Sequence, residues 1–169
     1  MNIVKSIFNI ILTSAIVIGC DGSLSSGYSV GPGIDPDAPG NWLQLSEGGQ
    51  SKIAMDTIII NHDYVGDYLV GVGMPAKVGS YICYDSSGVA KGEGGIIYRV
   101  KDKLDYFKFN LVTRSEEHYT SFSELYKALD KASFKTNNFN DAFIGNIRAE
   151  LLSNSRINRS TPTGCTTYF

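Results

Sequence analysis

A short apolar stretch near the start of the chain most limits what this polypeptide can form. Lys5 comes first, and residues 7–18 then supply about a dozen residues that are mostly apolar. A helix that crosses a membrane needs about 20 apolar residues, and Asn9, Thr13 and Ser14 interrupt this stretch. Its length and positive start are typical of a secretory signal. The sequence therefore predicts an exported protein whose residues 1–19 are a signal peptide.

The apolar stretch ends in Val17-Ile18-Gly19-Cys20. This ending resembles the lipobox of bacterial lipoproteins, where an aliphatic residue and two further residues, the last of them small, precede an invariant cysteine. The resemblance implies that Cys20 is acylated with diacylglycerol and becomes the first residue of the mature chain. It also implies a lipid anchor in the bacterial cell envelope, in the outer or the inner membrane. The alternatives are an ordinary cleaved signal and an uncleaved anchor helix.

The composition changes after Cys20. Residues 21–40 are rich in Gly, Ser, Pro and Asp, a composition that buries too little apolar surface to order itself. We therefore expect a flexible linker over residues 20–40 and a single domain over residues 41–169. Charged residues make up 19% of the chain and the formal net charge is -2. No basic run stands out in the sequence, which argues against nucleic acid as a partner.

Alternation of apolar and polar residues, together with runs of β-branched residues, predicts a β-rich first part. Gly71 and Gly73 fall in one such run and indicate a bulge or a close backbone approach. Pro75 is expected to end that strand. The expected strands cover residues 42–45, 52–60, 67–74, 78–84, 96–100 and 106–113, and a turn is expected at residues 85–88.

Two helices are expected after the strands. Ser121-x-x-Glu124 is a capping-box pattern that opens a helix ending near Ala132, and Asn140 or Asp141 can cap a second helix. Strands followed by helices predict an α+β domain, with an antiparallel sheet of about five or six strands and two C-terminal helices.

Three cysteines occur in the chain, and two remain if Cys20 carries lipid. An even pair in an exported protein is typical of a disulfide, so we expect Cys83 to pair with Cys165. Two buried free thiols or a metal pair are the alternatives. A metal would need two further ligands, and the only histidines, His62 and His118, are not near a cysteine in the sequence. We therefore expect no metal and no cofactor.

No catalytic set can be assembled from the sequence. His62-Asp63 lacks a nucleophile and an oxyanion hole, and the run from Glu116 to Tyr119 lacks a zinc-protease motif. The Asp35-Pro36-Asp37 segment supplies too few oxygen ligands for a calcium-binding loop. The glycines at 88, 92, 94 and 95 have strands on both sides, which favours a hairpin loop over a phosphate site. The sequence thus predicts a protein that is not an enzyme; a cell-wall hydrolase would need residues that we do not find.

Three segments share a recognisable pattern: Trp42–Leu45, Lys52–Ile58 and Tyr106–Tyr119, with a Trp-led strand, a hairpin, and an aspartate followed by a hydroxyl residue and isoleucine. In this pattern the chain resembles the surface-adhesin protein E family. The chain departs from the family in two places: it has no Trp in residues 68–74, and it has Phe107 or Phe109 where the family has a cysteine. The resemblance implies a small α+β lipoprotein on the bacterial surface that binds host matrix or plasma proteins.

Two functions follow as hypotheses. The first is a non-catalytic, membrane-anchored lipoprotein that binds a protein partner, adhesin-like toward host proteins. The second is a periplasmic protective lipoprotein, for toxin immunity or phage exclusion; Asp21 favours it, because an aspartate after the lipidated cysteine tends to retain lipoproteins at the inner membrane of enteric bacteria. Tyrosines suit contact surfaces, although half-buried sheet positions would equally explain them. The candidate contact residues are Tyr64, Tyr68, Tyr81, Tyr84, Tyr98 and Tyr119.

Overall fold

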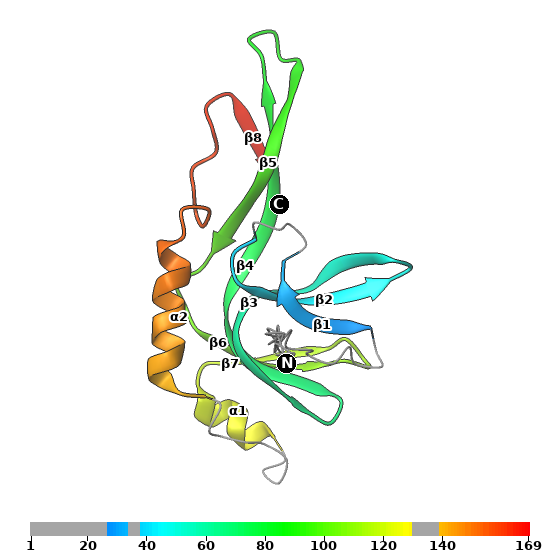
Figure 1. Ribbon diagram of the computed structural model, residues 1–169, viewed down its shortest axis with the longest axis vertical. Coiled ribbons are helices and arrows are strands. Elements are labelled where there is room, and N and C mark those ends of the chain that lie inside the picture. The colour runs from blue at the N-terminus through cyan, green and yellow to red at the C-terminus, as the bar shows by residue number, and fades with distance from the viewer. Residues whose placement is uncertain (1–26, 34–37, 130–138) are drawn as a thin grey trace, which may run out of the picture.

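The structure is a computed structural model that describes residues 27–33, 38–129 and 139–169. Cys20 and Asp35-Pro36-Asp37 lie outside the described residues. The expected α+β class is confirmed, because an antiparallel sheet precedes two helices (Figure 1). The sheet has eight strands rather than five or six, and the last strand follows the helices. In chain order the elements are β1 (Tyr28–Pro32), β2 (Asn41–Glu47), β3 (Gln50–Val65), β4 (Tyr68–Tyr84), β5 (Ala90–Val100), β6 (Asp105–Asn110), β7 (Glu116–Tyr119), α1 (Phe122–Ala128), α2 (Asp141–Ser153) and β8 (Cys165–Tyr168).

The 17-residue strand β4 organises the sheet. Its first half pairs with β3 and β6, and its second half pairs with β5 and β8, always antiparallel. The expectation that Pro75 ends the strand is wrong. The carbonyl oxygen of Pro75 accepts a hydrogen bond from Lys101 N, so the Pro75 nitrogen points to the same edge of β4. At this edge, residues 101–104 connect β5 to β6 and are not part of either strand. A missing N–H there costs no strand–strand hydrogen bond, which is why a proline is tolerated inside this strand.

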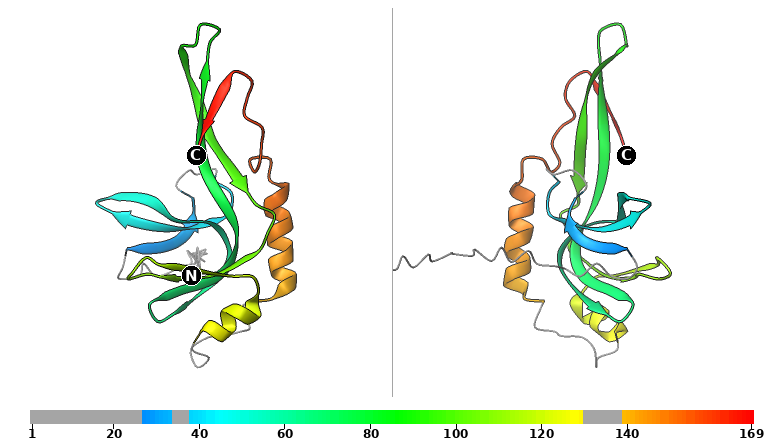
Figure 2. Two further views of the ribbon diagram at one scale, coloured as in Figure 1. Left: turned by 180° about the vertical axis from the view of Figure 1, so that it is seen from behind. Right: turned by 45° about the vertical axis from the view of Figure 1, so that its right-hand side comes forward.

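The change of partners divides the molecule into two regions. We call β5, β8 and residues 76–84 of β4 the arm, and the remaining described elements the body. The arm projects from the body as a long twisted ribbon, with the 85–89 turn at its tip (Figure 1). The views in Figure 2 show the arm extended in every orientation, with α2 alongside its base.

The body is a curled sheet in the order β1-β2-β3-β4-β6-β7. Three strands separate β1 from β6, yet the Tyr28 and Phe109 rings lie 5.7 Å apart in an edge-on contact inside the curl. Arg114 Nη2, in the β6–β7 turn, reaches Glu47 Oε1 at 2.6 Å. Burial of Tyr28 and Val30 orders β1, although its sequence has linker composition. The expected linker over residues 20–40 is therefore wrong at this point, because residues 28–32 belong to the folded body.

The two helices pack on the outer face of the curl. Ile144 and Leu151 of α2 join a buried cluster with Trp42 and Tyr98, and Leu125 of α1 packs against Val70. This cluster holds the base of the arm to the body, because Tyr98 comes from β5 and Trp42 from β2. None of the helices in the described part of the chain has the length and apolar character that a membrane span requires.

Both expected helix caps are present. Ser121 Oγ accepts from Glu124 N at 3.3 Å, and Asn140 Oδ1 accepts from Ala142 N at 2.9 Å. The first helix ends at Ala128 instead of near Ala132, with Leu129 as its extended C-cap residue. Local side-chain chemistry thus predicts where these helices begin more accurately than where they end.

The close approach expected at Gly71 is confirmed. A Cβ atom there would lie 2.5 Å from Phe107 Cζ and 2.7 Å from the Asn61 carbonyl oxygen. The neighbouring strand β3 has its irregularity between Ile59 and Asn61, so the bulge is on β3 and the glycine on β4 accommodates it.

Candidate functional site

The disulfide expected from the sequence links the arm to the end of the chain. Cys83 of β4 lies directly opposite Cys165 of β8, with a sulfur–sulfur distance of 1.97 Å and 3.9 Å between the Cα atoms. Only four residue pairs join β8 to β4. Strands this short are weakly held by backbone hydrogen bonds alone, so the covalent link has a large share in keeping β8 in place.

The tip of the arm is a tight turn. Asp85 Oδ1 accepts from Ser87 N, Ser87 Oγ and Val89 N at 2.7–2.9 Å. The hydrogen bonds from the Ser87 side chain and the Val89 backbone lower the pKa of Asp85, because they stabilise its ionised form. The turn expected at residues 85–88 is thus confirmed, and it gives the arm a defined tip.

One face of the arm exposes apolar side chains. Ser80 pairs with both Ile96 and Tyr168, and Ile82 is two residues further along β4, so these side chains point to the same side. Ile82 and Ile96 are each 39% exposed, and Tyr168 is 47% exposed. Tyr168 Oη lies 2.9 Å from Tyr84 Oη, and this hydrogen bond raises the pKa of Tyr168. We call Ile82, Tyr84, Ile96 and Tyr168 the apolar face of the arm.

The opposite face of the arm is cationic. Lys77 and Arg99 are paired residues on β4 and β5. Arg99 Cζ lies 5.9 Å from the centre of the Phe169 ring, and Arg159 Cζ lies 5.6 Å from the centre of the Tyr81 ring. These distances are typical of cation–π contacts, so both guanidinium groups are held against aromatic rings.

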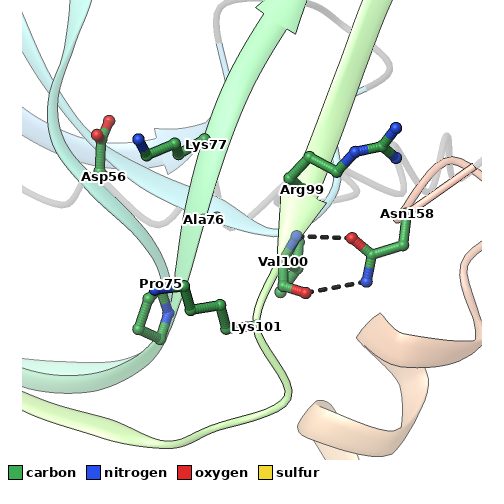
Figure 3. A pocket seen from close by; sticks show the side chains of 8 residues that line it. All are labelled: Asp56, Pro75, Ala76, Lys77, Arg99, Val100, Lys101 and Asn158. Carbon is green, nitrogen blue, oxygen red and sulfur yellow. Dashed lines mark hydrogen bonds between the residues drawn. The ribbon is translucent and has the colours of Figure 1, made fainter. Parts of the chain in front are cut away.

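A cavity of ≈ 380 Å³ opens where the arm meets the body. Its residues come from β3, β4, β5 and the segment after α2, and Figure 3 shows them around the opening. Asn158 makes hydrogen bonds of 2.9 Å to both the N–H and the carbonyl of Val100, which fixes the segment after α2 along β5. The lining residues are Asp56, Pro75, Ala76, Lys77, Arg99, Val100, Lys101 and Asn158.

The candidate tyrosines separate into three groups. Tyr81 and Tyr84 lie on the arm and are half-buried. Tyr98 is 2% exposed and packs 6.3 Å from Trp42, so its assignment to a contact surface is wrong: the cluster under α2 encloses it. The other three are half-buried body residues, as the alternative interpretation of sheet tyrosines expects. They are Tyr64, Tyr68 and Tyr119.

The two histidines lie on different strands and are not brought together. His62, Gly71, Phe107 and His118 occupy one cross-strand row, so the histidines are on strands that β4 and β6 separate. His118 Nδ1 contacts Asp105 Oδ2 at 2.5 Å, and no hydroxyl, thiol or amine group of the described residues hydrogen-bonds to the ring. Over residues 27–33, 38–129 and 139–169, no group of three His, Cys, Asp or Glu side chains is placed to hold a metal ion.

Sequence reasoning missed the arm as a unit. It identified residues 78–84 and 96–100 as strands and residues 85–88 as a turn, but it assigned no strand to residues 165–168. Alternation in Cys165-Thr166-Thr167-Tyr168 after a glycine was the available signal. No protein-family model, curated protein or solved structure matches this chain. The site must therefore be interpreted from its own geometry.

Proposed function

We propose that this protein is a non-catalytic, membrane-anchored lipoprotein that binds a protein partner through the apolar face of its arm. The observation that carries the proposal is the exposure of Ile82, Ile96 and Tyr168 together on one side of a projecting element. Side chains of this kind lose contact with water when a partner covers them, and that burial drives association. Aromatic residues are also enriched at the centres of protein interfaces.

The construction of the arm supports the same proposal. A two-stranded hairpin alone is marginally stable in water. Here the third strand β8, the Cys83–Cys165 disulfide and the packing of Tyr98 under α2 hold the hairpin in one conformation. A surface that is ordered before binding loses less conformational entropy when it binds, so affinity can be reached with a small contact area.

Lipid anchoring at Cys20 is the second part of the proposal. It rests on the resemblance of Val17–Cys20 to a lipobox. Because β1 belongs to the folded body, the short connection from Cys20 to β1 limits how far the body can lie from the anchor. Eight peptide units separate Cys20 from Tyr28, so a fully extended connection would span at most ~29 Å. We infer that the body lies near the membrane surface. The arm, which projects from the body, then keeps its apolar face accessible to a partner.

Cell fractionation tests the anchor. We expect the wild-type protein in the membrane fraction and the Cys20→Ser variant in the soluble or unprocessed fraction, with a mass that lacks the lipid. A Cys20→Ser variant that stays in the membrane pellet with an unchanged mass would contradict lipid attachment at this residue.

Two partner classes remain candidates, each with one observation in its favour. The resemblance of residues 42–58 and 106–119 to the surface-adhesin protein E family favours a host matrix or plasma protein. Asp21, next to the lipidated cysteine, favours a periplasmic toxin or phage component, because of the retention rule in enteric bacteria. Host serum and periplasmic extract are therefore the two sources in which to search for a partner.

A pull-down experiment tests the arm directly. Wild-type protein on beads is compared with the Ile82→Ser/Ile96→Ser variant and with Val112→Ser, which removes an even more exposed apolar side chain from the body, 69% against 39%. We expect a partner that the wild type and Val112→Ser both retain and that the double variant loses at least tenfold. Equal retention by all three proteins would show that the partner binds elsewhere.

A further inference from the structure

The cationic face of the arm, opposite the apolar face, has a charge distribution that the whole sequence does not reveal. Residues 76–101 and 154–169 carry six Lys or Arg against two Asp or Glu, whereas the complete chain carries 15 against 17. Four of the six cations, Lys77, Arg99, Lys101 and Arg159, come from two segments that are more than fifty residues apart in the chain. The fold brings these four together, because residues 157–159 run along β5 and Arg99 contacts Arg159.

Several cations of the body form ion pairs, whereas the cations on this face of the arm do not. Lys52, Arg114, Lys108 and Arg148 each form an ion pair with a body carboxylate at 2.5–3.1 Å. Within the part of the chain that the structure describes, Lys77 and Arg99 of the arm and the adjoining Lys101 and Arg159 make no ion pair with a carboxylate. We call these four residues the cationic strip: Lys77, Arg99, Lys101 and Arg159.

The two arginines of the strip are held in fixed positions. Arg99 Nη1 donates to the Arg159 carbonyl at 2.7 Å, and Arg159 Nη2 donates to the Ile96 carbonyl at 2.9 Å. Each guanidinium group also lies over an aromatic ring, Phe169 or Tyr81. Each arginine keeps further N–H groups that these contacts do not use, so it can still bind an anion.

The cavity at the base of the arm has an apolar lining and one carboxylate, and both restrict the kind of anion that can bind there. Pro75, Ala76 and Val100 supply an apolar lining between Lys77 and Lys101. Asp56 stands on the β3 side of the opening, facing the Lys77 side chain (Figure 3). A densely charged polyanion would be repelled by Asp56, whereas separated carboxylates with apolar side chains between them would avoid this repulsion.

We propose that the cationic strip and the adjoining cavity bind an acidic segment of a protein partner, with carboxylates at the lysines and arginines and apolar side chains in the cavity. This inference rests on the proposed function, because it specifies the chemistry of the partner that the arm binds. The partner would then contact both faces of the arm, with apolar contacts on one and charged contacts on the other. Charge complementarity of this kind also directs the approach of the partner over distances of about 10 Å at moderate salt.

A labelled peptide provides the probe. The N-acetylated and C-amidated heptapeptide Glu-Leu-Glu-Phe-Glu-Leu-Glu carries carboxylates at alternate positions, and the same capped peptide with Gln for every Glu is its uncharged control. We expect fluorescence anisotropy to show binding of the acidic peptide at 50 mM salt, at least tenfold weaker binding at 300 mM salt, and at least tenfold weaker binding of the Gln peptide. Equal binding of both peptides would overturn the proposal.

Variants that remove charge show where on the protein the acidic peptide binds. Lys77→Gln/Lys101→Gln removes two strip cations that are exposed and make no ion pair among the described residues, so the fold should be preserved. Lys91→Gln/Lys103→Gln removes the same charge from exposed lysines outside the strip. We expect the first variant to bind the acidic peptide about tenfold more weakly and the second to stay within twofold of wild type. Equal losses in both variants would contradict a defined site.

Two further outcomes separate this inference from the proposed function and from another ligand class. If no acidic peptide binds but a native partner is captured and then lost by Ile82→Ser/Ile96→Ser, the strip assignment is wrong and the proposed function stands. If the peptide binds as expected but no partner depends on Ile82 or Ile96, the apolar face is wrong and the strip stands. A sulfated polysaccharide that binds the strip more tightly than the peptide at equal salt would overturn the choice of an acidic protein segment.

Discussion

His118 Nδ1 lies 2.5 Å from Asp105 Oδ2, and this contact places a partly exposed ring on a carboxylate that is 7% exposed. A buried carboxylate that loses its hydrogen-bond partner is costly. We expect His118→Gln and Asp105→Asn to be coupled in a double-mutant cycle by about 1–3 kcal/mol in the free energy of unfolding. Urea unfolding followed by the fluorescence of Trp42, the sole tryptophan, measures it.

Glu116→Gln is the matched control for this cycle. Its carboxylate lies 3.5 Å from His118 Nε2, but its side chain is exposed. We expect a change of less than about 0.5 kcal/mol, because exposed ion pairs contribute little. A coupling energy near zero between His118 and Asp105 would mean that the contact does not stabilise the fold.

The Cys83–Cys165 disulfide closes a loop with a sequence separation of 82 residues. Loop-closure entropy gives a stabilisation of about 4–5 kcal/mol, an upper value because structure in the denatured chain reduces it. We expect Cys83→Ser/Cys165→Ser to lower the urea midpoint and to make residues 159–169 more sensitive to protease than the body. Mass spectrometry of the exported wild type without reductant should show no alkylatable thiol at either position. Two free thiols in the native protein would refute the pairing.

Gly71 and Gly145 should respond in opposite directions to alanine. At Gly71 the new Cβ atom would meet Phe107 and the Asn61 carbonyl, so Gly71→Ala should destabilise the protein by about 1–3 kcal/mol. Gly145 is on the exposed side of α2 and a Cβ atom there meets nothing within 4 Å, so Gly145→Ala should stabilise it by about 0.5–1 kcal/mol. Thermal or urea unfolding of both variants tests the pair; a neutral Gly71→Ala would show that β3 can move away.

Tyr119 should ionise at unusually high pH. Burial, followed by the hydrogen bond that its hydroxyl donates to Glu117 Oε2 and by the charge of Glu117, raises the pKa of Tyr119 to about 12 from an ordinary value of 10.0. Between these two pH values the unfolded chain binds fewer protons than the folded one. The stability from this group is therefore fully present below pH 10 and is lost as the pH rises toward 12.

Carbon-13 NMR of labelled tyrosine follows this titration residue by residue. We expect the tyrosine signal that titrates at the highest pH to be absent in Tyr119→Phe. In Glu117→Gln this signal should titrate at lower pH, because the negative charge is removed and a neutral amide oxygen is a weaker acceptor than a carboxylate. An unchanged titration in Glu117→Gln would show that Glu117 does not contribute to the raised pKa.

Local patterns in the sequence determined the features that depend on neighbouring residues. Alternation over residues 106–113 predicted a strand with one buried face; the strand that forms is Asp105–Asn110, and its Phe107 and Phe109 are buried. Ser121 and Asn140 predicted the starts of both helices, because a cap needs only its own side chain and the next turn. The disulfide was predicted from cysteine parity and from the expected export of the chain.

Tertiary structure alone decided the features that depend on distant partners. Residues 28–32 have linker composition, and they form a strand because β2 pairs with them and Phe109 packs on Tyr28. Pro75 continues a strand because its neighbour on that edge changes from β6 to β5 at that point. Tyr98 is enclosed by Trp42 and α2, and the cationic strip forms because residues 157–159 return to β5. Each outcome depends on contacts between residues far apart in the chain, and a local pattern carries no information about those contacts.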